Sequence, residues 1–176
     1  LQPGEPEFNG IVTHMNCVQG FFAVAIYAVS NPNLQSDFLR KSKEIARDNE
    51  NNPNIIQGIH CTSKNAAYSI GQNGFKIEFS GMGFFGKGAY FAGIKDFLKA
   101  NDYSPEKGQP RALRVMIICD VALGKNKNYE FGSFDKKLVH APEGYHSVGG
   151  FISRATEYVV YDPTQVLPKY LVFYNF

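Results

Sequence analysis

The sequence of 176 residues contains no tryptophan, only three cysteines and only four histidines. It also lacks a long apolar run, because the longest one near the start, residues 21–29, is too short to span a bilayer and follows no basic segment. The formal net charge is only +2 and no block of like charges stands out. These absences argue against a membrane protein and supply no general drive toward nucleic acid, so we expect a soluble protein.

The few cysteines and histidines offer neither a disulfide framework nor a metal site. Cys17, Cys61 and Cys119 are odd in number and widely spaced, which favours a reducing compartment such as the nucleus or the cytoplasm. His14 and Cys17 have no second pair at metal-ligand spacing. His60 and Cys61 are adjacent at an expected strand end, so their side chains should point to opposite faces. We therefore expect no metal.

The composition predicts one folded domain over residues 1–176. Apolar residues make up 44% of the chain, with 15 Phe and 10 Tyr, which is typical of a packed core. The chain begins without Met, which suggests a part of a larger protein. The patterns predict a mixed α+β domain with helices at 34–50, 63–73 and 95–102, and strands at 20–30, 55–59, around Tyr90, at 113–123, weakly at 137–140, at 156–162 and at 169–176. Residues 124–155 are otherwise expected to be mostly loop.

The stretch Phe-Phe-Gly-Lys-Gly-Ala-Tyr-Phe-Ala at residues 84–92 predicts a tight turn that enters a strand. Tyr90 would leave this turn with a ring face available to a flat ligand. A hairpin with a merely half-buried Tyr90 is the alternative that the residues leave open. The stretch lacks the third glycine and the helix of a dinucleotide-binding fingerprint, so it does not indicate a Rossmann unit.

Glu157 lies in the late strand predicted at 156–162, where alternation places it on the same face as Val159 and Tyr161. A carboxylate on an apolar face indicates either an edge strand in contact with water or a site that uses the charge. The residues alone leave both interpretations open. The aromatic residues that alternate in the last two strands are expected to be core: Tyr161, Tyr170, Phe173, Tyr174 and Phe176.

Several segments resemble, in the same order, the motifs of the poly(ADP-ribose) polymerase catalytic domain: residues 31–49, 59–63 (IHCTS), 85–92 (FGKGAYFA), 156–162 (TEYVVYD), Gln165 and 167–171 (LPKYL). Residues 140–148 are most similar to tankyrases. The resemblance extends roughly from Val24 to the end of the chain. It implies an ADP-ribosyltransferase fold of mixed, mostly antiparallel sheets with a few peripheral helices around an NAD cleft. No segment of this sequence resembles the zinc-binding insertion of tankyrases or the helical regulatory domain of some members, so we expect a minimal transferase domain here.

The resemblance also implies a donor site in which NAD is a substrate and no metal takes part. Glu157 resembles the catalytic glutamate, which with His60 and Tyr90 forms a set that accompanies chain-forming members. The implied donor contacts are His60 to the adenosine ribose, the backbone after His60 (Cys61, Thr62) to the nicotinamide amide, the strand Tyr90, Phe91 and Ala92, and Tyr103 as a second stacking ring. Lys99 resembles the family's companion lysine.

The chain departs from the family pattern at two donor positions. Cys61 replaces the usual glycine after the histidine, and Leu98 or Ala100 stands where a serine usually bonds the amide, so weaker NAD binding is expected. The function implied is transfer of ADP-ribose, as one unit or as a chain, from NAD to a protein acceptor, which can be the protein itself. The acceptor loop would lie within residues 124–153. The alternative is an inactive relative that binds NAD or a protein partner.

Overall fold

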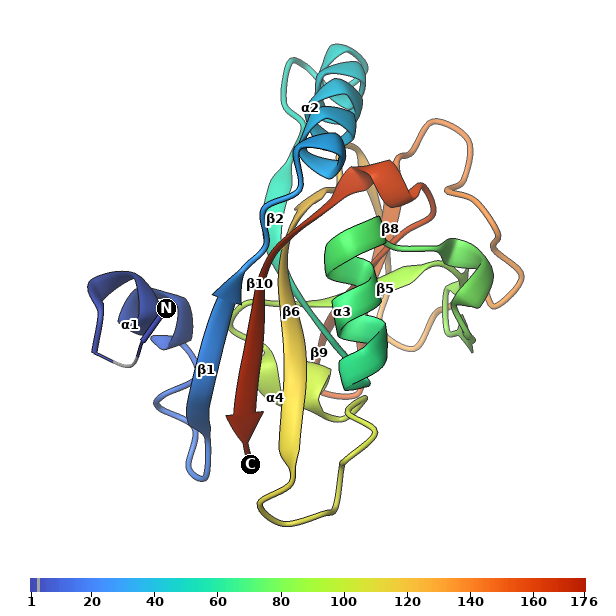
Figure 1. Ribbon diagram of the computed structural model, residues 1–176. Coiled ribbons are helices and arrows are strands. Elements are labelled where there is room, and N and C mark those ends of the chain that lie inside the picture. The colour runs from blue at the N-terminus through green and yellow to red at the C-terminus, as the bar shows by residue number, and fades with distance from the viewer. Residues whose placement is uncertain (3) are drawn as a thin grey trace.

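The computed structural model describes residues 1–2 and 4–176 and shows one large sheet with helices packed on both of its faces (Figure 1). The helices are α1 (Pro6–Val12), α2 (Pro32–Arg47), α3 (Lys64–Asn73) and α4 (Phe97–Asn101), with 3-10 turns η1 (Ile77–Phe79) and η2 (Pro163–Gln165). The strands are β1 (Phe22–Ala28), β2 (Ile55–Thr62), β3 (Met82–Gly83), β4 (Gly86–Lys87), β5 (Ala89–Gly93), β6 (Leu113–Ala122), β7 (Asn126–Tyr129), β8 (Ser147–Ile152), β9 (Ala155–Val160) and β10 (Val166–Asn175).

Eight strands form the main sheet in the order β1-β10-β6-β2-β5-β9-β8-β7, and β3 and β4 form a small separate hairpin. Neighbours are antiparallel except for the pair β7 and β8, which is parallel. The predicted α+β class with a mostly antiparallel sheet is therefore confirmed.

The strand β6 lies in the middle of the core, as its almost continuous apolar sequence predicts. Met116 and Ile118 pack on one face with α1 and α4, while Val115 and Ile117 pack on the other face with Ala67 of α3. In Figure 1, α3 crosses one side of the sheet and α4 lies on the opposite side. This arrangement fixes α4, which carries part of the site described below, against β2 and β5.

Local signals explain where the two longer helices begin and end. The Asn31 side chain accepts hydrogen bonds from the first turn of α2, and Pro32 stands at the first helical position, so this helix starts before the predicted residue 34. Ser63 caps α3 by accepting from the backbone N–H of Ala66, and Gly74 ends it with φ 75°. The predicted cap and stop of α3 are confirmed.

The region 124–155 differs from its prediction. The weak strand expected at 137–140 is wrong, since those residues are irregular, and the expected loop contains β7 and β8. Two consecutive glycines, Gly149 and Gly150, are typical of a turn in the sequence, yet both lie inside β8. A Cβ at position 150 would come within 2.4 Å of the Phe85 ring, so glycine is required there for packing rather than for turning. The short helix α1 was also not predicted.

The sheet splits between β2 and β5, and this split makes room for the site. The two strands pair only at Gly58 with Gly93 and at Ile59 with Ala92. Beyond Ile59, β2 stays paired with β6 alone, and β5 stays paired with β9. His60 and Tyr90 therefore face each other across diverging strands.

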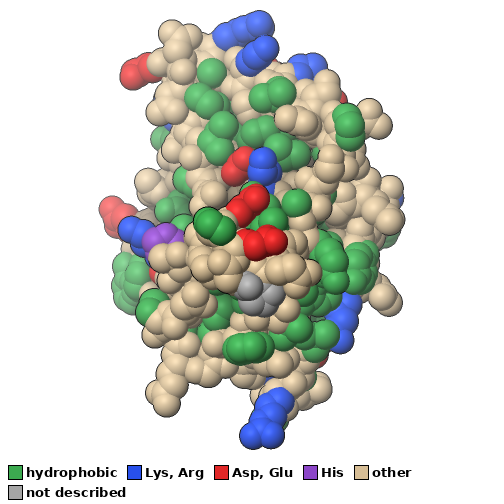
Figure 2. All heavy atoms as spheres, turned by 60° about the vertical axis from the view of Figure 1, so that its left-hand side comes forward, with side chains coloured by type: hydrophobic (Ala, Val, Ile, Leu, Met, Phe, Trp, Pro, Cys, Tyr) green, Lys and Arg blue, Asp and Glu red, His purple; other side chains and the backbone are tan. Residues whose placement is uncertain are grey.

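The surface agrees with the modest charge of the sequence. Figure 2 shows acidic and basic side chains scattered among apolar ones on one face, without a continuous basic stripe among the described residues of that view. No helix in the described part of the chain is both long enough and apolar enough to cross a membrane.

Candidate active site

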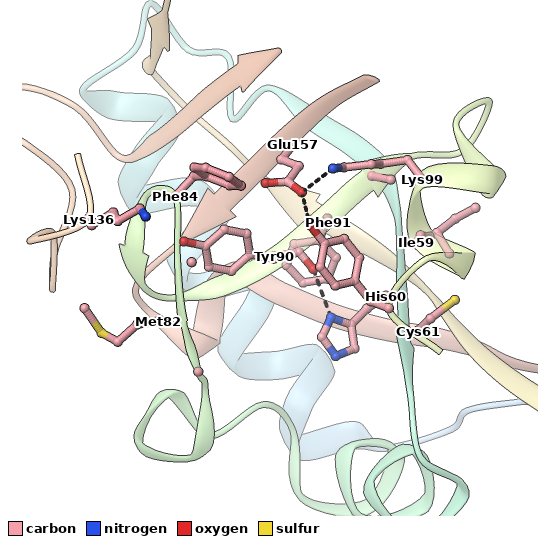
Figure 3. A pocket seen from close by; sticks show the side chains of 15 residues that line it. Ile59, His60, Cys61, Met82, Phe84, Tyr90, Phe91, Lys99, Lys136 and Glu157 are labelled. Atoms are coloured by element: carbon pink, nitrogen blue, oxygen red, sulfur yellow. Dashed lines mark hydrogen bonds and ion pairs between the residues drawn. The ribbon is translucent and has the colours of Figure 1, made fainter. Parts of the chain in front are cut away.

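A cavity of about 630 Å³ opens where β2 and β5 diverge (Figure 3). This volume lies within the range of small-molecule sites. Its walls come from β2, β5, the segment around α4, β9 and two loops, and the lining residues are Ile59, His60, Cys61, Gly81, Met82, Gly83, Phe84, Tyr90, Phe91, Ala92, Lys99, Ala100, Tyr103, Lys136 and Glu157. Segments far apart in the sequence thus meet at one place.

Glu157 is the only carboxylate that lines the cavity among the described residues, and it is only 3% exposed. It belongs to β9, where it pairs with Ala92 of β5 and Gly150 of β8. Since β9 has a neighbour on each side, the edge-strand interpretation of Glu157 is excluded. The charge lies in the interior, where it needs partners.

Two side chains hold one oxygen of Glu157. The Lys99 ammonium lies 2.9 Å from Oε1, and the Tyr103 hydroxyl donates to the same oxygen at 2.6 Å. Oε2 is buried and has no hydrogen-bond partner among the described residues, and in Figure 3 it points away from Lys99. The carboxylate is therefore fixed through one oxygen, and its other oxygen is a buried acceptor whose hydrogen-bonding capacity is unused by the described residues.

Lys99 and Tyr103 reach Glu157 from the same side because they are four positions apart, one turn of helix, at the end of α4. The Lys99 ammonium also lies 5.3 Å from the centre of the Tyr103 ring. Burial and, next, the hydrogen bond to Glu157 raise the pKa of Tyr103, so its hydroxyl stays protonated and donating. Tyr103 lines the cavity as predicted, but its stacking role remains a prediction.

Replacing Lys99 with methionine should lower the free energy of unfolding by about 3 kcal/mol, because it leaves the buried Glu157 without its cation. Chemical denaturation monitored by circular dichroism measures this loss. Lys107→Met is the matched control, since Lys107 pairs with Asp102 at 3.0 Å on the surface and should contribute less than about 0.5 kcal/mol. Equal losses in the two variants would contradict a structural role for the buried pair.

Tyr90 lines the cavity with its ring, and its hydroxyl is anchored at the far end. The hydroxyl accepts from the Phe85 N–H at 2.9 Å and donates to the Gly86 carbonyl at 2.8 Å. Burial raises the pKa of Tyr90 to about 12, so it stays neutral. A Cβ at Gly83 would come within 2.5 Å of the hydroxyl end of this ring, which explains a glycine there. The half-buried Tyr90 thus also presents its ring to a cavity.

His60 bridges the split between the strands. Its Nδ1 lies 2.9 Å from the Tyr90 carbonyl oxygen, which can only accept, so Nδ1 carries the proton. Burial lowers the pKa of His60, while the hydrogen bond to Tyr90 acts in the opposite direction. A neutral ring with Nε2 available as an acceptor follows.

A second cavity of about 540 Å³ adjoins the first and shares His60, Cys61, Gly81 and Tyr90 with it. Thr62, one of the predicted donor contacts, lines this second cavity rather than the first. The two cavities together make one extended site with His60 at its middle.

The Cys61 side chain points into the core. Its Sγ lies 3.6 Å from the Tyr174 hydroxyl, and burial raises the pKa of the thiol to about 12. Cys61 is therefore inert as a nucleophile and leaves room for a ligand beside its backbone.

Ala100, and not Leu98, faces the cavity. Ala100 is 4% exposed and lines the wall, whereas Leu98 is 39% exposed and is not a lining residue. The structure thus gives no place to Leu98 among the donor contacts. The wall has a methyl group where the family resemblance leads one to expect a hydroxyl.

No sequence pattern assigned a role in the site to the lining side chains of Met82, Phe84 and Lys136. They lie in irregular segments or in the short hairpin, where no periodic pattern indicates which side chain points inward. The Lys136 ammonium lies 5.2 Å from the centre of the Phe84 ring, which places the loop after β7 beside the cavity. No group of three or more potential metal-binding side chains occurs within residues 1–2 and 4–176.

A comparison with known protein families identifies the family to which most of this chain is similar. Residues 7–156 match the family described as the poly(ADP-ribose) polymerase catalytic domain. The match stops one residue before Glu157, so the place of Glu157 in the cavity rests on the structure.

The chain is similar to two relatives that are both named protein mono-ADP-ribosyltransferase PARP4. The human protein is 31% identical over 157 residues, covering 84% of this chain and 9% of the relative. The mouse protein is 35% identical over 105 residues, covering 54% of this chain and 5% of the relative. The chain thus spans less than a tenth of the length of these relatives, and they lend no support to a special similarity to tankyrases. From the match over most of its length, the chain belongs to the poly(ADP-ribose) polymerase catalytic domain family.

Proposed function

We propose that this domain transfers ADP-ribose from NAD to a protein side chain and releases nicotinamide. The observation that carries the proposal is Glu157, a buried carboxylate that lines the cavity beside Tyr90 with Oε2 unpartnered among the described residues. A fixed negative charge of this kind is costly in a binding wall and useful where positive charge develops.

Each residue has a defined task in this proposal. The Tyr90 ring provides a flat face for nicotinamide, with the exposed ring of Tyr103 across the cavity as the second face. Breaking the glycosidic C–N bond leaves the electron pair with nicotinamide and positive charge on the ribose. Glu157 stabilises that charge, and because Lys99 and Tyr103 already hold Oε1, the carboxylate needs little reorganisation. An acceptor carboxylate oxygen, or a hydroxyl oxygen or amine nitrogen that gives up its proton to water, then bonds to the ribose carbon.

His60 supports a donor that extends through both cavities. NAD has two nucleoside halves, and a site of two adjoining cavities with a shared histidine fits such a length. We assign nicotinamide to the cavity that contains Glu157 and the adenosine half to the cavity that contains Thr62. The free Nε2 of His60 would accept a hydrogen bond from a ribose hydroxyl of the adenosine half.

Ala100 favours one competing proposal, a domain that binds NAD or a partner with little turnover. Restoring a hydroxyl by Ala100→Ser should lower the KM for NAD about fivefold, because one hydrogen bond to the nicotinamide amide contributes about 1 kcal/mol. Steady-state kinetics with varied NAD measures the change. Leu98→Ser adds the same hydroxyl two residues away, outside the cavity, and should leave the KM unchanged. Equal effects of both substitutions would contradict the assigned position of the amide.

We further propose that one unit is added at a time. The name of both relatives, mono-ADP-ribosyltransferase, supports this, whereas the set of His60, Tyr90 and Glu157 accompanies chain-forming members and left the product length open. Gel electrophoresis after incubation with NAD tests both the transfer and the product length. A discrete shifted band supports single transfer, a ladder contradicts it, and an unshifted protein without any labelled acceptor contradicts the proposed function.

A further inference from the structure

The turn at Phe85 and Gly86 determines where the Tyr90 ring lies. The Tyr90 hydroxyl bonds to the backbone of this turn, accepting from the Phe85 N–H and donating to the Gly86 carbonyl. The Phe85 side chain is fully buried, and its ring packs against the Tyr129 ring and against Gly150. The Phe85 ring lies so close to Gly150 that a Cβ at position 150 would have no space. A shift of the turn would therefore move the ring along the cavity wall.

Tyr161 holds the same turn from the sheet. Its hydroxyl donates to the Phe85 carbonyl at 2.7 Å. Tyr161 directly follows β9, the strand that carries Glu157, and burial raises its pKa, so the hydroxyl remains a donor. Both polar backbone groups of Phe85 thus bond to tyrosine hydroxyls, which links Tyr161 through Phe85 to Tyr90.

A second support of the turn comes from a segment without regular secondary structure. The Lys87 N–H donates to the Leu138 carbonyl at 2.8 Å, and Leu138 lies in an irregular segment between β7 and β8. A support from an irregular loop can move with that loop, whereas Tyr161 is attached to an interior strand. The hydroxyl of Tyr161 is therefore a side-chain link between the turn itself and the strand of Glu157, in addition to the backbone pairing of β5 with β9 that begins at Ala89.

We infer that Tyr161 is a positioning residue for donor binding, which fixes the Phe85–Gly86 turn and through it the Tyr90 ring at a set position relative to Glu157. This inference rests on the proposed function. It gives a role to a tyrosine that the sequence pattern alone assigns to the core. The residue touches neither the cavity nor the reacting atoms, since it is not a lining residue.

The variant Tyr161→Phe keeps the ring and removes only the hydroxyl. We expect the KM for NAD and the dissociation constant of free nicotinamide to rise roughly three- to tenfold, with kcat changed less than about twofold, because the loss acts on ring placement rather than on Glu157. Tyr170→Phe is the matched control, since it removes a hydroxyl that bonds the exposed Glu7 at 3.0 Å and should change neither constant.

A double-mutant cycle with Tyr90→Phe distinguishes positioning from general loosening. Both hydroxyls act through one turn, so the effects of Tyr90→Phe and Tyr161→Phe on nicotinamide binding should be clearly less than additive. Calorimetry with nicotinamide measures all four proteins, and thermal unfolding shows whether each is folded.

The inference is overturned if Tyr161→Phe binds nicotinamide as the wild type does, if it lowers only thermal stability, or if the two effects add. Failure of the proposed function would instead appear in the wild-type protein itself, which would transfer no ADP-ribose from NAD whether or not it binds nicotinamide.

Discussion

Replacing Glu157 with glutamine is expected to reduce the rate of ADP-ribose transfer at saturating NAD by about 10²–10³-fold, the size typical of removing one electrostatic stabiliser. Glutamine keeps the shape and one acceptor oxygen but removes the negative charge that opposes the developing charge on the ribose. The KM for NAD should change much less, since Tyr90 and His60 are intact. Single-turnover nicotinamide release, followed by chromatography, separates the two constants.

The matched control for this prediction is Glu106→Gln, the same change at a glutamate that is not a lining residue of the cavity. It should leave the rate unchanged. If Glu157→Gln retained more than a tenth of the wild-type rate, the assigned electrostatic role of Glu157 would be wrong. Circular dichroism should accompany the kinetics, because the buried Lys99 loses its counter-charge in this variant.

Replacing Tyr90 with alanine is expected to raise the KM for NAD roughly 10- to 100-fold, because a flat aromatic contact and its buried area are lost together. The kcat should fall less than in Glu157→Gln, since the charge beside the ribose remains. Isothermal titration with NAD or nicotinamide measures the binding loss directly.

Tyr27→Ala serves as the control for ring removal, since Tyr27 is exposed on β1 and packs edge-on against Phe173. Its effect should appear in stability alone. A KM for the Tyr90 variant that matches the wild type within a factor of two would show that nicotinamide does not lie on this ring.

The sequence predicts well those parts of the fold that depend on local chemistry. The continuous apolar run of β6, the cap and stop of α3 and the alternation around Glu157 each have a physical signal within a few residues, and the structure agrees with them. The resemblance of several motifs also predicted that the chain belongs to the poly(ADP-ribose) polymerase catalytic domain family, and the match over residues 7–156 confirms this prediction.

Features that depend on distant contacts could not be predicted in this way. Gly150 looks like a turn residue until the Phe85 ring is seen packed against it. The choice between Leu98 and Ala100 depends on how α4 is rotated against the sheet. The irregular segment that brings Lys136 to the cavity has no periodicity at all.

The role of Tyr161 also depends on a distant contact. Its hydroxyl has a partner 76 residues away in the chain. Alternation within the strand shows only which face the ring lies on, and it does not show what the hydroxyl bonds.

The most direct measurement uses two preparations of NAD, one labelled in nicotinamide and one labelled in adenine, each incubated with the wild-type domain and analysed by intact-protein mass and by release of free label. The proposed transfer predicts that the nicotinamide label appears in solution while the adenine label becomes covalently attached to protein as a single ADP-ribose. If neither label changes its state, so that both remain together on intact NAD, the domain does not break the glycosidic bond, and the proposed transfer is contradicted.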